Sequence, residues 1–214
     1  YPAMTGLLRL AGDTGGPSSP RPARIFVPGR PAGRSHPLPV IERDLTDQVY
    51  ILGTDTVDFS SRTDHQQFLI FRGLLDALRD EDLIIRQDPA NVAVLSRGDG
   101  VFICFRHPQN RLAPLQVALR MRPHFPELRF GVNAGPATWI LMRGGGTEVI
   151  SHAINWAARV MTAATGSQVL LSDPYYRTIV QPSTDDLPEA TFRFVPGLAT
   201  KHDEPLPAWE VITR

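Results

Sequence analysis

An Asp-Gly turn between two apolar runs is the feature of this sequence that most constrains its fold. The runs are residues 92–95 and 101–105, and they flank Arg97-Gly98-Asp99-Gly100. Because Asp-Gly between strand-forming segments is a strong hairpin signal, we expect an antiparallel β-hairpin here. Such a hairpin excludes an all-helical fold and places Asp99 at the end of a strand, where its carboxylate can face solvent or a ligand.

Around this hairpin, short apolar runs alternate with amphipathic segments. The spacing of apolar residues predicts helices over residues 64–80, 112–121 and 149–164. Strands are expected at residues 49–54, 128–134, 169–171, 192–195 and 208–212. This order of elements predicts an α+β fold, in which helices cover one face of an antiparallel-rich sheet.

The first 46 residues have a different composition, in which Pro, Gly, Ser and Arg dominate. Such a segment offers little apolar surface to offset the entropy lost on ordering. We therefore expect residues 1–46 to form an arm or lead-in, with at most a short strand at residues 23–27. The folded domain is expected over residues 47–214.

Charge and composition argue against several classes of partner. The 214 residues include 22 Lys or Arg and 22 Asp or Glu, so no general attraction to nucleic acid or to an anionic membrane is indicated. No apolar run approaches the roughly 18 residues that a membrane span needs. Cys104 is the only cysteine, which excludes an internal disulfide. We therefore expect a cytoplasmic protein.

Asp55 and Asp99 are the first candidates for chemistry, because each ends a strand-like run where the chain turns. Two carboxylates combined with a triphosphate would make an oxygen-rich site, which suits Mg²⁺ or Mn²⁺. The spacing alone leaves open that both are ordinary turn residues, since Asp is common in loops and Asp-Gly is common in hairpins.

Six blocks of the sequence resemble, in the same order, segments of class III nucleotide cyclases. They are Gly53-Thr54-Asp55-Thr56-Val57-Asp58-Phe59-Ser60, Gly98-Asp99-Gly100-Val101-Phe102, Leu128-Arg129-Phe130-Gly131-Val132-Asn133-Ala134-Gly135-Pro136, Ile154-Asn155-Trp156-Ala157-Ala158-Arg159, Ser167-Gln168-Val169-Leu170-Leu171-Ser172 and Glu204-Pro205-Leu206-Pro207-Ala208-Trp209-Glu210-Val211. Each block alone is a weak signal, but six in register over about residues 48–212 are specific.

The resemblance implies a ferredoxin-like cyclase fold and a head-to-tail homodimer with active sites across the interface. It implies that Asp55, Asp99 and the carbonyl of Thr56 hold two divalent metal ions. Asn155 and Arg159 would come from the other subunit, where Asn155 would orient the ribose and Arg159 would stabilise charge on the α-phosphate. For Asn155 and Arg159 the alternative is a solvated helix face.

The resemblance also implies two further substrate contacts. One is Phe59, near the end of the first metal-binding block. Lys201 lies near the place where the family often carries a lysine that binds the triphosphate, although an ordinary surface lysine is the alternative.

The positions that read the base depart from the family pattern. Where purine cyclases carry a polar pair, this chain has Leu95, which can neither donate nor accept a hydrogen bond, and Glu148. Arg97 follows Leu95 by two residues, so we expect it on the same face of a strand, where a long forked cation would favour a smaller base. Tyr50 either fills space near the base or belongs to the core.

These departures favour a pyrimidine nucleotide cyclase that converts UTP to 3′,5′-cyclic UMP and pyrophosphate. Guanidinium donors suit the two carbonyl oxygens of uracil, so UTP is expected ahead of CTP. The chain is similar to the uridylate cyclases of bacterial antiphage defence, whose product is a second messenger for a separate effector. The alternatives are a cytidylate cyclase, an adenylate or guanylate cyclase with atypical base contacts, a degenerate nucleotide-binding or dimerisation module, and a generic ferredoxin-like interaction domain.

Overall fold

The computed structural model describes residues 41–85, 88, 90–97, 99–142, 146–198 and 206–213. The strand considered at residues 23–27, most of the expected arm and Lys201 lie outside these ranges. The first described strand, β1 (Ile41–Thr56), begins earlier than the run at residues 49–54 from which it was expected. Its first residues pair with β4 (Leu128–Met142), so residues assigned to the arm by composition belong to the sheet.

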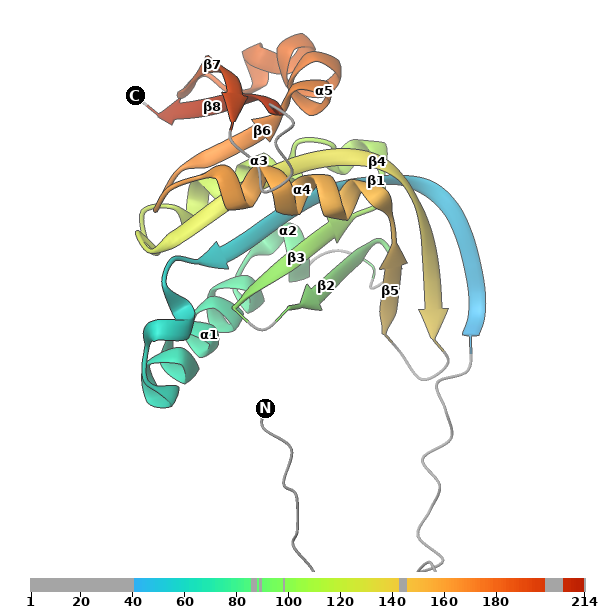
Figure 1. The fold of residues 1–214 in the computed structure, drawn as a ribbon. Helices are drawn as coiled ribbons and strands as arrows, with labels where there is room; N and C mark the ends of the chain where they lie inside the picture. The colour runs from blue at the N-terminus through green and yellow to red at the C-terminus, as the bar shows by residue number, and fades with distance from the viewer. Residues whose placement is uncertain are drawn as a thin grey trace, which may run out of the picture. The chain divides into compact units, whose positions relative to one another are not determined.

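Within these ranges the chain forms one sheet of eight strands in the order β2-β3-β1-β4-β6-β8-β7, with β5 paired to β4 off this path. The remaining strands are β2 (Val92–Ser96), β3 (Gly100–Phe105), β5 (Thr147–Ile150), β6 (Val169–Ser172), β7 (Ala190–Leu198) and β8 (Leu206–Thr213). β4 and β6 are parallel, and the other pairs are antiparallel. The expected hairpin and the antiparallel-rich α+β sheet are confirmed (Figure 1).

The helices follow the amphipathic segments of the sequence. They are α1 (Asp64–Arg79), α2 (Asp82–Ile85), α3 (Ala113–Met121), α4 (His152–Ala163) and α5 (Asp173–Tyr175), with short helical turns η1 (Phe59–Ser61), η2 (Pro108–Asn110), η3 (Tyr176–Val180) and η4 (Gln181–Asp186). α1 begins with a capping box. The side chain of Thr63 accepts from the backbone N–H of Gln66, and the side chain of Gln66 accepts from the backbone N–H of Thr63. None of the helices described is both long and apolar enough to cross a membrane.

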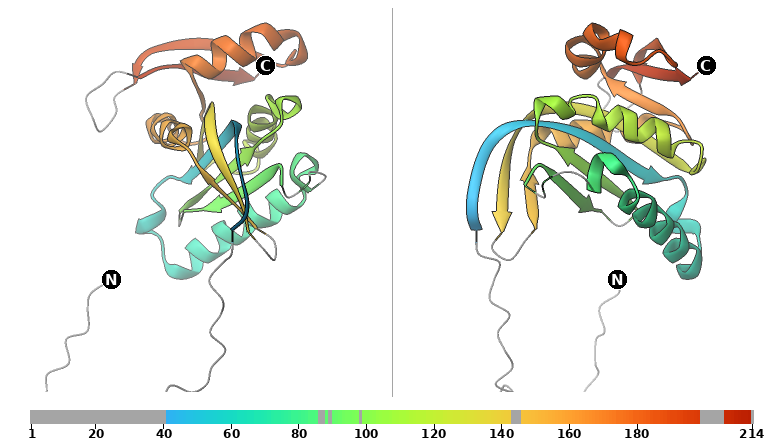
Figure 2. Two further views of the ribbon diagram at one scale, coloured as in Figure 1. Left: turned by 90° about the vertical axis from the view of Figure 1, so that its right-hand side faces the viewer. Right: turned by 180° about the vertical axis from the view of Figure 1, so that it is seen from behind.

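Helices cover both faces of the sheet, so the expectation of a single covered face is wrong. One apolar cluster joins α1 and α3 to Tyr50 and Leu52 of β1, and a second joins α4 to Val49 and Ile51 of the same strand. Figure 2 shows α4 on the opposite side of the sheet from α1 and α3. The physical reason is visible in β3, whose residues are all buried, because a strand that is apolar on both faces must be covered on both.

Two boundaries differ from the sequence prediction. β4 continues through Gly135-Pro136 to Met142. Pro136 lies between the residues of β4 that pair with β6 and those that pair with β5. The missing N–H of Pro136 therefore breaks no hydrogen bond to either of these two strands. The helix expected from residue 149 begins at His152, because residues 147–150 form β5 and the Ser151 side chain caps α4 by accepting from the N–H of Ala153.

Candidate active site

Asp55 and Asp99 are brought together where β1 and β3 pair. Asp55 lies opposite Gly100 in the antiparallel register, and the backbone N–H of Thr56 donates to the carbonyl of Asp99 at 3.2 Å. Asp55 is only 4% exposed, whereas Asp99 lies in the turn and is exposed. The two strand-end carboxylates singled out in the sequence are therefore neighbours in space.

Gly100 makes this close approach possible. A Cβ atom at this position would lie 1.8 Å from the carbonyl oxygen of Thr54 and 2.9 Å from the Cα of Asp55. Every other residue carries that atom, so only glycine lets the two strands meet here without displacement. The glycine of the Asp-Gly turn thus sets the spacing between the two aspartates as well as the shape of the turn.

Arg129 is a residue of this site that the sequence analysis did not single out. It lies opposite Asp55 in the β1–β4 register, and its Nε donates to Asp55 Oδ2 at 2.6 Å while its Nη2 donates to the same oxygen. Its Nη1 donates at 3.3 Å to the carbonyl of Thr162, in the last turn of α4. An arginine within an otherwise apolar strand run was the signal that could have identified it.

The electrostatics of Asp55 reflect three opposing effects. Burial is the largest and raises the pKa of the carboxyl group above its ordinary value; the paired Arg129 lowers this pKa, and the adjacent Asp99 carboxylate raises it again. The pKa of Asp55 is raised overall. A cation placed between Asp55 and Asp99 would relieve both the burial of charge and the repulsion between the carboxylates.

The donor set fits a divalent metal ion. Asp55 and Asp99 supply carboxylate oxygens, and the adjoining Thr56 supplies a backbone carbonyl, which are the ligand types that Mg²⁺ and Mn²⁺ prefer. The described residues hold no group of three or more His, Cys, Asp or Glu side chains suited to a metal. Two carboxylates leave coordination positions for water and phosphate oxygens, as is usual where Mg²⁺ accompanies a nucleotide.

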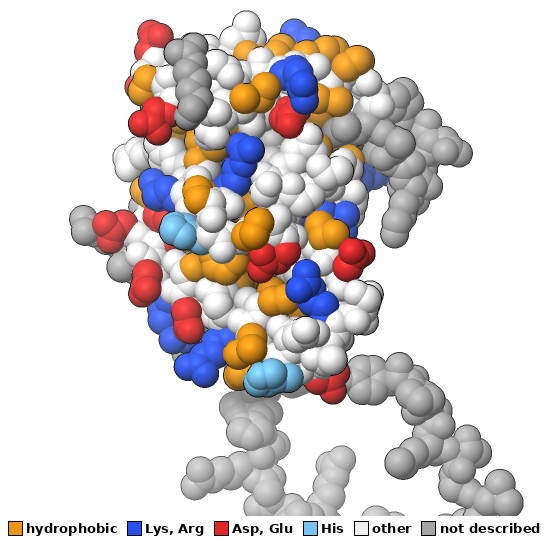
Figure 3. All heavy atoms as spheres, turned by 90° about the vertical axis from the view of Figure 1, so that its left-hand side faces the viewer, with side chains coloured by type: hydrophobic (Ala, Val, Ile, Leu, Met, Phe, Trp, Pro, Cys, Tyr) orange, Lys and Arg blue, Asp and Glu red, His pale blue; other side chains and the backbone are white. Residues whose placement is uncertain are grey.

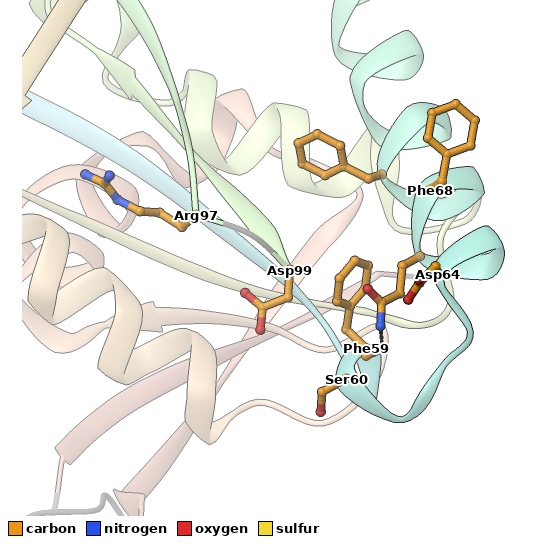
Figure 4. Close-up of a pocket in the computed structure, with 8 residues that line it drawn as sticks. Phe59, Ser60, Asp64, Phe68, Arg97 and Asp99 are labelled. Carbon is orange, nitrogen blue, oxygen red and sulfur yellow. Dashed lines mark hydrogen bonds between the residues drawn. The ribbon is translucent and has the colours of Figure 1, made fainter. Parts of the chain in front are cut away.

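A hollow of about 720 Å³ opens beside Asp99. It is lined by Phe59, Ser60, Asp64, Gln67, Phe68, Phe71, Arg97 and Asp99. Gln67 fixes one wall by donating to the carbonyls of Phe59 and Arg62 at 3.1 and 3.0 Å. Figure 4 shows the Arg97 guanidinium directed away from the rings of Phe59 and Phe68. The structure thus places Phe59, Arg97 and Asp99 around one cavity.

Leu95 and Arg97 lie on the α4 side of the hairpin. Leu95 is buried in the apolar cluster under α4, together with Cys104. Arg97 is exposed just beyond the end of β2, and its backbone N–H donates to the carbonyl of Gly100 at 3.0 Å. Burial raises the pKa of Cys104 to about 12, and the charge of Arg97 opposes this rise, which agrees with Arg97 lying on that face.

Of the two alternatives for Tyr50, the structure favours a place in the core. Tyr50 is 7% exposed and belongs to the apolar cluster under α1 and α3, on the opposite face of the sheet from Leu95. Burial also raises the pKa of its hydroxyl group. Because side chains alternate along a strand, Tyr50 points away from the face that carries Asp55.

Glu148 is an exposed residue of β5, where it pairs with Ile140 of β4. It is not among the residues that line the hollow beside Asp99. The structure therefore leaves its expected contact with the base as a prediction.

Asn155 and Arg159 lie on α4, one turn apart and away from the sheet. Asn155 is exposed and lines a separate hollow of about 390 Å³ with Ser151 and His152. Arg159 is half-buried, with its guanidinium carbon 5.3 Å from the centre of the Trp156 ring. Neither residue lines the hollow beside Asp99, so one chain alone does not bring them to that cavity.

The position of α4 is set by Gly131 in β4. A Cβ atom there would lie 2.4 Å from the backbone nitrogen of Met161 and 2.5 Å from the carbonyl oxygen of Ala157. The helix backbone therefore rests directly on the strand. This contact fixes the distance between the sheet and α4, the helix that carries Asn155 and Arg159.

Charges of both signs are mixed at this end of the molecule. Figure 3 shows Lys or Arg side chains interspersed with Asp, Glu and hydrophobic side chains on the side where β1 ends and α1 begins. No field of a single sign covers this surface, in agreement with the balanced composition. Recognition of an anionic ligand here would depend on individual groups.

By sequence, neither a protein-family model nor a curated protein matches the chain. By structure, it is similar to the adenylyl cyclase CyaB from P. aeruginosa, with 16% identity and a TM-score of 0.61 over 80% of this chain and 97% of that one. The guanylate cyclase domain of RhGC from Catenaria anguillulae, in complex with GTP, gives 16% identity and a TM-score of 0.60, covering 80% and 99%. A non-canonical dimeric guanylyl cyclase domain of the RhoGC fusion protein from Blastocladiella emersonii gives 16% and 0.58, covering 80% and 99%.

These similarities define the class of fold. The described domain has the architecture of adenylyl and guanylyl cyclase catalytic domains, which confirms the fold expected from the sequence.

Proposed function

We propose that this protein is a class III nucleotide cyclase that converts UTP to 3′,5′-cyclic UMP and pyrophosphate. The observation that carries the cyclase assignment is the placement of Asp55 beside Asp99, where β1 ends and β3 begins, within a cyclase-like fold. The hollow beside Asp99 offers about 720 Å³ for a nucleotide or part of one. An ordinary turn role explains neither the burial of Asp55 nor its position next to a second carboxylate.

The proposed chemistry assigns a role to each group. Divalent metal ions, when bound, would lower the pKa of the ribose 3′-OH and balance the charge of the triphosphate. Asp55, Asp99 and the Thr56 carbonyl would hold them. Asn155 would orient the ribose, and Arg159 would stabilise charge that develops on the α-phosphate.

The proposed homodimer is supported by the placement of these residues. Asp99 and Asn155 line different hollows in one chain, and Arg159 lines neither of them, so a second copy would have to supply the missing half of each site. The RhoGC domain that resembles this chain is dimeric, which supports the proposal.

The proposed preference for uridine depends on Leu95, Arg97 and Glu148. Leu95 is buried and cannot hydrogen-bond to a purine edge, whereas Arg97 is exposed and can reach a ligand from the same face. Its N–H donors would pair with the carbonyl oxygens of uracil better than with the amino group of cytosine. Lys201 is retained as a proposed triphosphate contact from its place in the sequence.

The wider role is proposed from the sequence resemblance. Cyclic UMP would act in the bacterial cytoplasm as a second messenger of antiphage defence and would activate a separate effector. Neither a nucleic acid nor a membrane is proposed as a partner.

The product spectrum tests the proposal. Purified protein is incubated with ATP, GTP, UTP or CTP and Mn²⁺, and the products are resolved chromatographically against standards, with Asp99→Asn as the inactive control. Cyclic UMP is expected as the main product. Mainly cyclic AMP or cyclic GMP would refute the pyrimidine assignment, and triphosphate binding without any cyclic product would support a non-catalytic module.

Arg97→Ala tests the assignment of the base. Turnover of UTP should fall by more than tenfold while Mn²⁺ affinity stays unchanged. Arg106→Ala is the matched control, because Arg106 follows the far end of β3 and pairs with Asp47 at 2.9 Å. An unchanged ratio of UTP to CTP turnover in Arg97→Ala would show that another residue reads the base.

A further inference from the structure

The ion pair between Arg129 and Asp55 engages one oxygen of a carboxylate that is proposed as a metal ligand. Both side chains lie on the α4 face, and two guanidinium nitrogens donate to the same carboxylate oxygen, Asp55 Oδ2. Asp55 is 4% exposed and the Arg129 side chain is 26% exposed. The carboxylate is thus enclosed, while the arginine retains a route to solvent.

A buried carboxylate requires a compensating charge, since an unpaired charge in the interior costs several kcal/mol. Arg129 supplies that charge in the structure described here. A divalent cation at Asp55 would supply it as well, but a guanidinium and a divalent cation on one carboxylate repel each other strongly at short range. Occupation of Asp55 by Arg129 and by a metal ion should therefore exclude each other.

We propose that Arg129 is a latch that closes the metal site, and that metal binding releases its guanidinium from Asp55. The inference rests on the proposed function, because it takes Asp55 as a metal ligand. Arg129 acts here as a positioning residue: it keeps the carboxylate compensated and oriented until a metal ion takes its place.

The end of α4 offers the released guanidinium an anchor. Arg129 Nη1 already donates to the carbonyl of Thr162 at 3.3 Å, and the Thr162 hydroxyl donates to the carbonyl of Arg159 at 3.0 Å. Carbonyls in the last turn of a helix carry partial negative charge and have no partner within the helix. The latch can therefore open by rotation about this contact, and its position is linked to the helix that carries Asn155 and Arg159.

The test is Mn²⁺ affinity without nucleotide, measured from free Mn²⁺ by electron paramagnetic resonance. Arg129→Gln removes the competing charge and should bind Mn²⁺ at least fivefold more tightly than the wild type, and this gain should vanish when Asp55→Asn is added. Arg193→Gln is the matched control, because Arg193 makes a similar cross-strand pair with Glu210 on β7 and β8. Its Mn²⁺ affinity should stay within twofold of the wild type.

Arg129→Lys keeps the charge but cannot make the forked contact. It provides a second measurement in case Arg129→Gln does not fold. Its affinity for Mn²⁺ should lie between those of the wild type and Arg129→Gln. Thermal unfolding is the second readout: Mn²⁺ should raise the midpoint of Arg129→Gln more than that of the wild type. Equal or weaker Mn²⁺ binding by both variants, or an equal rise of the midpoint, would overturn the latch.

The latch and the proposed function fail in distinguishable ways. Cyclic UMP formation by the wild type, with Mn²⁺ affinity unchanged in Arg129→Gln, would refute the latch alone. Tighter, Asp55-dependent Mn²⁺ binding by Arg129→Gln, with no cyclic product from any triphosphate, would refute the proposed reaction and retain the latch.

Discussion

The two faces of the sheet differ in what they contain. The face under α1 and α3 is a continuous apolar layer, to which β1 contributes Tyr50 and Leu52. On the α4 face, apolar residues give way at one end to the charged pair of Asp55 and Arg129, and helix backbone rests directly on Gly131. Neighbouring residues of a single strand therefore serve different purposes, one set stabilising the domain and the other forming the candidate site.

The largest expected effect is the loss of cyclase activity when a charged residue on the α4 side of the sheet is replaced. Asp55→Asn and Arg159→Ala should each lower cyclase activity by about 1000-fold, equivalent to about 4 kcal/mol, because each removes charge stabilisation of the reacting phosphates. Mixing the two variants should restore about a quarter of the wild-type activity, since half the dimers would be mixed and each would carry one intact site of two. Failure of the mixture to recover would place the complete site within one chain.

Adding a methyl group on each face should have opposite effects. Gly131→Ala should destabilise the domain by about 3 kcal/mol, because the new Cβ overlaps the backbone of α4. Gly73→Ala in α1 is the control: its Cβ would lie 3.8 Å from a Phe125 ring carbon, and it should stabilise the helix by up to about 1 kcal/mol. Urea unfolding gives both values. Equal stability of the two variants would contradict the close packing of α4.

At the rim of the α1/α3 face, Asp173 should contribute stability that depends on pH. Hydrogen bonds from Arg177 and then from Trp209 hold its pKa below the ordinary value of 3.8. Its contribution is therefore fully present above about pH 4 and is lost as pH falls through the lowered pKa of the folded state. Asp173→Asn should cost about 1 kcal/mol at neutral pH and nothing at strongly acidic pH. A difference that is independent of pH, measured by Trp fluorescence during urea unfolding, would contradict this assignment.

The smallest effect is expected at Tyr50. Tyr50→Phe should change the ratio of UTP to CTP turnover by less than about twofold, because the ring lies in the core on the face opposite Leu95. The same ratio measured in Arg97→Ala, where a change is expected, provides the comparison. A change of base preference in Tyr50→Phe would mean that the two faces are not separated as described.

Local elements could be predicted from the sequence because their signals are local. The helix over residues 64–80 follows from apolar periodicity, and the hairpin over residues 92–105 follows from two apolar runs and the Asp-Gly turn between them. The extension of β4 beyond Pro136 and the existence of β5 could not be predicted in this way. Both depend on which strands lie alongside, and pairing partners leave little trace in a single segment.

The sequence by itself determined that Asp55 follows one apolar run and that Asp99 lies in the hairpin turn, so both carboxylates could be singled out as candidates from the sequence alone. Alternation along β1 also separates Tyr50 from Asp55, although the choice of face requires knowing what covers each side. Only the tertiary structure placed Arg129 on Asp55, a contact between residues 74 positions apart. Strand register and helix packing bring such residues together, and these are properties of the whole sheet, whereas periodicity and turn chemistry are properties of a few consecutive residues.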